Sequence, residues 1–96
     1  MFEVHKTDEY EDWITSLADA RGRALITARV ERLQLGNFGS AKSVGDGVSE
    51  LKIDFGPGYR VYFSRTGKTV VLLLCGGDKS TQAKDIRRAK QMAASL

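Results

Sequence analysis

The residues of this chain best suited to chemistry are cations and carboxylates that alternate with apolar side chains between positions 47 and 75. Alternate residues of a β-strand point to opposite faces, so the pattern predicts three strands with one apolar face and one charged face. We expect the charged face to be open to solvent. Its members are Glu50, Lys52, Asp54, Arg60 and Tyr62.

The register of the first two strands decides which of these side chains meet. A tight loop through Gly56-Pro57-Gly58 would place Asp54 opposite Arg60. Lys52 would then lie diagonally beside the arginine, and both cations could reach one anion. The arginine suits phosphate, because its planar guanidinium group binds two oxygens and stays charged. A cross-strand ion pair between Asp54 and Arg60 is the simpler interpretation, and the two are compatible.

A second candidate anion site follows the last strand, in Gly76-Gly77-Asp78-Lys79-Ser80-Thr81. This run lacks the Gly-x4-Gly-Lys-Ser/Thr spacing of nucleoside triphosphate sites, which argues against a site of that kind. Lys79 nevertheless precedes the expected start of a helix, where backbone N–H groups favour an anion. The alternative is that Lys79 is a solvated loop residue.

Several reaction classes lack the residues that they need. His5 is the only histidine, so cleavage of RNA by a pair of histidines is unavailable. Cys75 is the only cysteine, which excludes an internal disulfide and a zinc site with several cysteines. Because Cys75 ends an apolar strand, we expect it to be a buried small hydrophobe. The sequence predicts no metal site and no cofactor.

Length and charge set further limits. A chain of 96 residues allows one domain, over residues 1–96, with a single modest core. No apolar run is long enough to span a membrane, and the N-terminus lacks the pattern of a signal peptide, so we expect a cytoplasmic protein. The net charge is +3, and the basic residues gather in two segments, 21–32 and 79–90. They suggest a polyanion or an acidic protein as partner, or simply solvated helix faces.

Periodicity and capping residues predict the other elements. A short strand over residues 2–6 precedes a helix with Asp8 as its N-cap. A second helix is capped by Asp19 and stops at Gly36. Residues 37–47 are rich in glycine and serine and are expected to form a flexible loop.

The last helix, after Ser80 or Thr81, has a thin apolar face that predicts shallow packing. Its apolar positions are Ala83, Ile86, Ala89, Met92 or Ala93, and Leu96. The expected order is therefore β-α-α-β-β-β-α. A helical hairpin followed by a run of strands is typical of the α+β class. We expect an antiparallel sheet with the hairpin on one face and a C-terminal helix.

Two segments carry a resemblance to a known family. They are Glu50-Leu51-Lys52 with Tyr59-Arg60-Val61-Tyr62, and Gly76-Gly77-Asp78-Lys79-Ser80-Thr81-Gln82. With the expected element order, the chain resembles the RelE/ParE toxin superfamily and is most similar to its addiction module killer, or HigB-like, subgroup. The resemblance implies the RelE-like fold. It also implies a toxin of a type II toxin-antitoxin system and a helix-turn-helix antitoxin that neutralises it.

The resemblance also implies roles for particular residues. RelE-like members cleave mRNA in the ribosomal A site, and the positions that surround the scissile phosphate are here Lys52, Arg60 and Lys79. Such cations would stabilise the charge that builds up as the ribose 2′-OH attacks. Glu50 is the candidate general base, because this chain lacks the tyrosine that RelE carries in its final helical segment. Further RNA contacts are expected from Tyr62, Arg65, Lys84, Arg87 and Arg88.

Two other functions remain open at this point. ParE-like members share the fold but poison DNA gyrase without cleaving RNA. Alternatively, the charged face is a non-catalytic docking surface for an acidic partner, whose binding would weaken with salt.

Overall fold

The computed structural model describes all residues from 1 to 96. Its elements are β1 (Glu3–Lys6), α1 (Asp8–Ser16), α2 (Ala20–Gln34), β2 (Lys42–Gly45), β3 (Val48–Ile53), β4 (Tyr59–Thr66), β5 (Val70–Gly77), a single 3-10 turn (Lys79–Thr81) and α3 (Gln82–Ala94). This is an α+β architecture compatible with the RelE-like fold, as predicted. No helix is long and apolar enough to cross a membrane.

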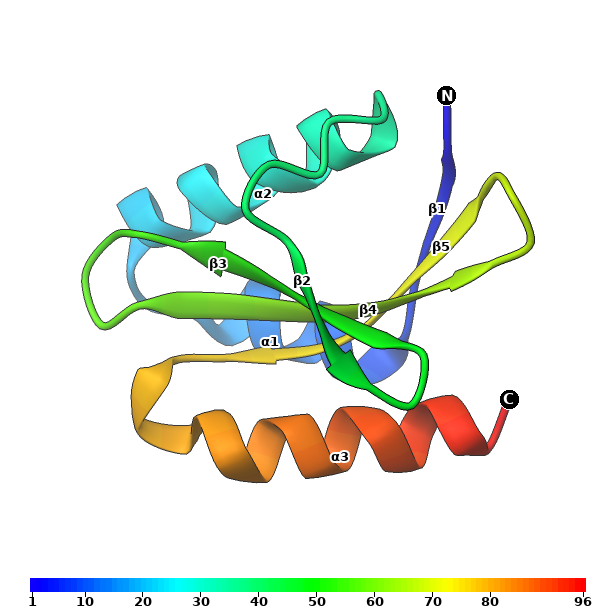
Figure 1. Ribbon diagram of the computed structural model, residues 1–96. Helices are drawn as coiled ribbons and strands as arrows, with labels where there is room; N and C mark the ends of the chain where they lie inside the picture. Colours follow the sequence, from blue (N-terminus) through cyan, green and yellow to red (C-terminus); the bar gives the residue numbers. More distant parts are fainter.

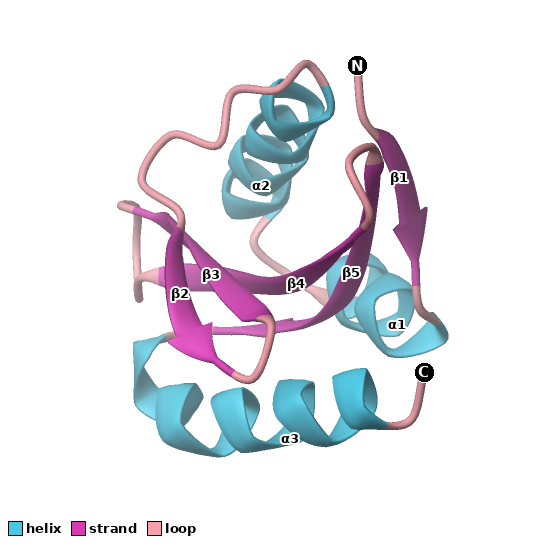
Figure 2. Ribbon diagram, turned by 45° about the vertical axis from the view of Figure 1, so that its right-hand side comes forward, coloured by secondary structure: helices cyan, strands magenta, loops and turns pink.

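The five strands form one sheet in the order β1-β5-β4-β3-β2. All neighbouring strands are antiparallel except β1 and β5, which run parallel, so the sheet is mixed rather than wholly antiparallel. Figure 2 shows β1 beside β5 at one edge and β2 at the other. The order is thus β-α-α-β-β-β-β-α, with one strand more than expected.

The additional strand, β2, lies within the segment that was predicted to be a flexible loop. Lys42 pairs with Glu50, and Ser43 pairs with Ser49. The turn between β2 and β3 is Asp46-Gly47, and both of its residues have positive φ, 55° and 74°. Asp-Gly at such a turn is a strong hairpin signal, so the sequence did contain the information.

Helices cover both faces of the sheet (Figure 1). On the face of α1 and α2, the larger apolar cluster includes Ile26 and Leu33 from α2 with Val61 and Phe63 from β4. On the opposite face, a smaller cluster centres on Ala89 of α3. Its other buried members are Val48, Tyr62, Leu74 and Cys75. The sheet face predicted to be open is therefore covered by α3.

The predicted ends of the first two helices are confirmed in part. Asp19 caps α2, accepting a hydrogen bond from the Gly22 N–H at 2.9 Å, as predicted. Gly36 follows the end of α2 with a φ of 93°, which suits a glycine stop. The prediction for α1 was wrong by one residue, because Thr7 is the N-cap and its hydroxyl accepts from the Tyr10 N–H at 3.1 Å.

The predicted register of the central hairpin was wrong by two residues. Ile53 pairs with Tyr59, and Lys52 lies directly opposite Arg60. Asp54 therefore falls in the loop and cannot face Arg60 across the ladder. The loop is longer than expected because Gly56 and Gly58 both adopt positive φ, 56° and 77°, which widens the turn.

Candidate functional site

A hollow of about 380 Å³ lies at the loop end of β3 and β4, and three cations line it. We call it the cationic pocket. Its lining residues are Lys52, Asp54, Phe55, Gly56, Pro57, Gly58, Arg60 and Lys79. The structure thus brings together Lys52, Arg60 and Lys79, which come from β3, β4 and the turn after β5.

Strand pairing and one backbone hydrogen bond hold these cations in place. Register sets Lys52 opposite Arg60, and Arg60 opposite Gly77 at the end of β5. The Lys79 N–H donates to the Pro57 carbonyl at 3.2 Å, which ties the turn after β5 to the β3–β4 loop. Gly58 leaves room for two of the cations, since an added Cβ would lie 3.1 Å from Arg60 Nη1 and 3.6 Å from Lys79 Cβ.

Arg60 is buried, with 5% of its surface exposed. Its Nη1 donates to the Gly58 carbonyl at 2.6 Å. Its Nε lies 3.3 Å from Glu50 Oε1, an ion pair without a well-directed hydrogen bond. The ion pair predicted between Arg60 and Asp54 is therefore wrong, and Asp54 instead lies 3.2 Å from Lys52 Nζ.

Glu50 is the centre of a buried polar network beneath α3. It is 1% exposed, and its Oε1 accepts from Gln82 Nε2 at 2.8 Å and from the Tyr62 hydroxyl at 3.3 Å. Burial, and next the negative charge of Glu50, raise the pKa of Tyr62, so its hydroxyl stays a donor. A carboxylate held in this way can exchange a proton with a substrate only if α3 moves.

Tyr62 likewise cannot touch RNA in this conformation, because it is fully buried. The other residues expected to bind RNA lie outside the cationic pocket. Arg65 sits at the far end of β4, with its guanidinium 4.9 Å from the ring centroids of Phe2 and Phe38. Lys84, Arg87 and Arg88 are exposed on α3.

The cationic pocket can bind and stabilise an anion. Its three positive groups include Lys52, which is paired with Asp54 at the rim, and Arg60, which is paired with the buried Glu50. A guanidinium group with ammonium groups beside it is suited to an anion with several oxygens, such as a phosphate. Preorganised cations of this kind stabilise charge that develops during phosphoryl transfer. Sequence reasoning missed Gln82, whose amide links α3 to the network that holds Arg60.

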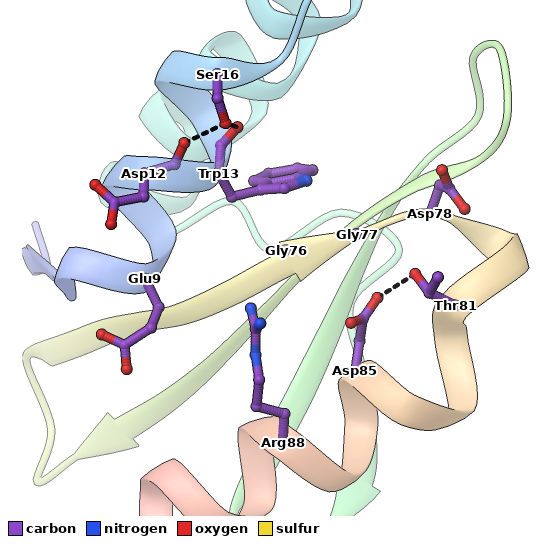
Figure 3. A pocket seen from close by; sticks show the side chains of 10 residues that line it. All are labelled: Glu9, Asp12, Trp13, Ser16, Gly76, Gly77, Asp78, Thr81, Asp85 and Arg88. Atoms are coloured by element: carbon purple, nitrogen blue, oxygen red, sulfur yellow. Dashed lines mark hydrogen bonds between the residues drawn. The ribbon is translucent and has the colours of Figure 1, made fainter.

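A second hollow, of about 460 Å³, opens between α1 and α3 at the end of β5 (Figure 3). We call it the acidic cleft. Its lining residues are Glu9, Asp12, Trp13, Ser16, Gly76, Gly77, Asp78, Thr81, Asp85 and Arg88. Sequence reasoning did not find it, although the Gly76-Gly77 pair is a signal for close approach.

Only glycine fits at positions 76 and 77. They are the last two residues of β5. A Cβ at Gly76 would collide with the Trp13 ring, and one at Gly77 would collide with the Asp85 carboxylate. Of the polar residues in α3, Asp85 alone is buried, and it accepts a hydrogen bond from the Thr81 hydroxyl at 2.6 Å.

Comparison with known proteins identifies the family of the chain. The family model described as phage-derived protein Gp49-like (DUF891) matches residues 12–94. A protein of Haemophilus influenzae, described as an uncharacterized protein, is 51% identical over 94 residues, covering 98% of this chain and 95% of its own. The chain therefore belongs to the Gp49-like family of phage-derived proteins, a toxin-type family related to RelE and HigB.

Proposed function

We propose that this protein is the HigB-like toxin of a type II toxin-antitoxin system, and that it arrests translation by cleaving mRNA on the ribosome in the cytoplasm. The observation that carries the proposal is the convergence of Lys52, Arg60 and Lys79 on one pocket. A cognate antitoxin, a helix-turn-helix protein, would neutralise it.

The cations would act on the scissile phosphate. As the ribose 2′-OH attacks, negative charge grows on the phosphate oxygens, and the pocket's fixed positive groups stabilise it. Arg60 is suited to this task because Gly58 and Glu50 hold its guanidinium in one orientation. Lys79 stands at the rim on an exposed turn, where it can follow the RNA backbone.

The test is primer extension on mRNA from cells that briefly express the protein. Lys79→Ala and Arg60→Ala should each remove the discrete cleavages within translated frames that the unmodified chain produces. Removing one such contact typically costs about 2.7–4 kcal/mol of barrier, or about a hundred- to a thousand-fold in rate. Lys68→Ala, in the exposed β4–β5 turn, is the matched control and should cleave normally.

Lys79→Ala is the more decisive variant, because Arg60 is buried and its loss also threatens the fold. A folded Lys79→Ala protein with full toxicity would contradict the proposal. So would growth arrest with intact mRNA and damaged DNA, which would indicate a gyrase poison.

A further inference from the structure

A recess of about 260 Å³ lies between α2 and the loop that follows β3. We call it the α2 recess. It is smaller than the pockets of about 300–1,000 Å³ that hold drug-sized ligands, so its size suits a single ring system. Most of its lining is apolar, and the apolar members are Leu25, Ala28, Ile53 and Phe55.

The α2 recess and the cationic pocket share a wall. Phe55 and Asp54 line both, and Asp54 is paired with Lys52. The Phe55 N–H donates to the Ile53 carbonyl at 2.9 Å, and the Phe55 carbonyl accepts from the Gly58 N–H at 3.1 Å, so the loop fixes the position of the ring. The ring packs against the larger apolar cluster and remains partly exposed. A ligand with its charged part in the cationic pocket can therefore place an adjoining flat group against Phe55.

Arginines of α2 surround the recess. Arg29 and Arg32 line it, and the guanidinium carbon of Arg21 lies 5.5 Å from the centre of the Phe55 ring. Arg29 is held in place, because its Nη1 donates to the Lys52 carbonyl at 3.3 Å. Arg21 and Arg32 are exposed and form no ion pair. The recess thus combines an aromatic ring with uncompensated positive charge.

These features match a nucleotide better than an acidic protein segment. Nucleobases stack on aromatic rings and on the guanidinium plane of arginine, and arginine also binds phosphate. An exposed leucine needs no explanation by itself, but Leu25, which is 38% exposed, lines a recess that also holds Phe55. A base and its phosphate are joined by a single sugar, so neighbouring groups of one strand can fill both the recess and the cationic pocket.

We propose that the α2 recess binds the nucleobase that adjoins the phosphate in the cationic pocket, and that this base stacks on Phe55. The inference rests on the proposed function, since it assigns a second part of the same RNA. Stacking tolerates every base, so the recess orients the strand rather than selecting a sequence. Arg32 is free to bind the RNA backbone beyond the stacked base.

The probe is a 2′-O-methyl trinucleotide with 2-aminopurine as its central base. The methyl groups block attack by the 2′-OH, so the probe is not cleaved. Its central base has a phosphate on each side, so either phosphate can enter the cationic pocket. The fluorescence of 2-aminopurine falls when the base stacks, and titration with the full chain should therefore show saturable quenching.

Substitutions at Phe55 test the stacking. Phe55→Leu keeps an apolar side chain but removes the aromatic face, so it should abolish the quenching and weaken probe binding about ten- to a hundred-fold. Phe55→Tyr keeps the ring and should retain both. Phe2→Leu is the matched control and should bind normally. Phe2 is also partly exposed, with the Arg65 guanidinium 4.9 Å from its ring centroid, but it lines neither the recess nor the cationic pocket.

A second probe separates stacking from a structural role of the ring. It is the same trinucleotide with an abasic sugar at its centre. Phe55→Leu should bind this abasic probe as the unmodified chain does, because the phosphate contacts do not use the ring. Lys79→Ala should weaken the binding of both probes, since Lys79 lines the cationic pocket.

Several results would overturn the inference. They are the absence of saturable quenching at millimolar protein, full affinity of Phe55→Leu for the 2-aminopurine probe, or equal loss of both probes in that variant, which would mean that the ring only shapes the loop. Amide NMR shifts at Leu25 and Phe55 caused by an acidic helical peptide, but not by the probe, would indicate a protein partner instead.

The inference and the proposed function can fail separately. If Lys79→Ala abolishes mRNA cleavage while Phe55→Leu cleaves and binds the probe normally, only the base-binding role of the recess is refuted. If the probes behave as expected while mRNA in the expressing cells stays intact, the nuclease is refuted and the recess remains a nucleotide-binding site.

Discussion

At the scale of single residues, the Glu50–Arg60 pair explains how a charged group can be held still at the rim of a sheet. Both side chains are buried, and the pair is surrounded by donors from Tyr62 and Gln82. Such a pair contributes little to stability when compared with apolar residues, but removing one partner leaves an uncompensated buried charge. Its role is therefore better described as positioning of Arg60 than as stabilisation.

A double-mutant cycle with Glu50→Gln and Arg60→Gln tests this description. Each single variant should lose about 3–5 kcal/mol of unfolding free energy in urea denaturation, and the double variant should lose clearly less than the sum. The surface pair of Asp46 and the partly exposed Lys90, 3.6 Å apart, is the control and should couple by less than about 1 kcal/mol. Additive losses for Glu50 and Arg60 would show that the two do not interact.

The junction between α2 and β4 makes a second prediction at this scale. The Gly22 N–H, and next the Tyr59 hydroxyl at 2.7 Å, lower the pKa of Asp19 from its ordinary value of 3.8. The stabilisation that this gives is present above pH 3.8 and is lost as the pH falls through the lowered pKa. The same hydrogen bond raises the pKa of Tyr59 to about 12. The Tyr59 hydroxyl therefore stays protonated at mildly alkaline pH and continues to donate to Asp19.

Tyr59→Phe should therefore be less stable than the unmodified chain at neutral pH, with a difference that shrinks in acid. Urea midpoints measured from neutral pH to below the ordinary aspartate range would check this. The Asp19 pKa, followed by NMR, should rise in the variant. A difference in stability that is independent of pH would mean that only packing had been lost.

At the scale of elements, the sequence predicted most strands and helices, because each is marked by local signals. Alternation marks β3 and β4, and Asp19 marks the start of α2. The register of the β3–β4 hairpin could not be predicted in this way, since it depends on how Gly56 and Gly58 shape the loop. The two-residue error placed Asp54 in the ladder, whereas it lies in the loop.

The burial of the charged face beneath α3 was not predicted, for a different reason. Alternation shows that a strand has two faces, but it does not show whether polar residues on one of them meet water or each other. Here Glu50, Arg60 and Tyr62 satisfy one another beneath α3, so a face that looks solvent-exposed in sequence is closed. The three cations of the pocket were nevertheless named from the sequence. Alternation along the strands singled out Lys52 and Arg60, the expected helix start singled out Lys79, and only the resemblance to RelE-like proteins placed the three around one phosphate.

At the scale of the whole molecule, the two hollows lie on opposite sides of the β4–β5 end, and α3 contributes to the surroundings of both. Its Gln82 holds Glu50 behind the cationic pocket, and its Asp85 lines the acidic cleft. Asp78 and Lys79, adjacent in sequence, line the acidic cleft and the cationic pocket, respectively. A movement of α3 would therefore change both hollows together.

Cys75 can report on how firmly α3 is attached to the sheet. Ala89 is the only fully buried apolar residue that α3 contributes, so the helix should open at a lower free energy than the sheet. Cys75, the only cysteine, lies fully buried in the cluster beneath α3, its thiol 3.8 Å from the Asp85 carbonyl, and burial raises its pKa. Iodoacetamide should thus react with it only when α3 lifts.

We expect alkylation of Cys75 under native conditions to be slow but faster than global unfolding. Gln82→Ala and Met92→Ala should accelerate it several-fold, because each removes a contact of α3 with the sheet, whereas Leu25→Ala on the exposed side of α2 should not. Mass spectrometry of the alkylated chain, alongside unfolding rates extrapolated from urea, provides the comparison. If alkylation only keeps pace with global unfolding in every variant, α3 and the sheet form one cooperative unit. Glu50 then has no route to a substrate, and catalysis would depend on the cationic pocket alone.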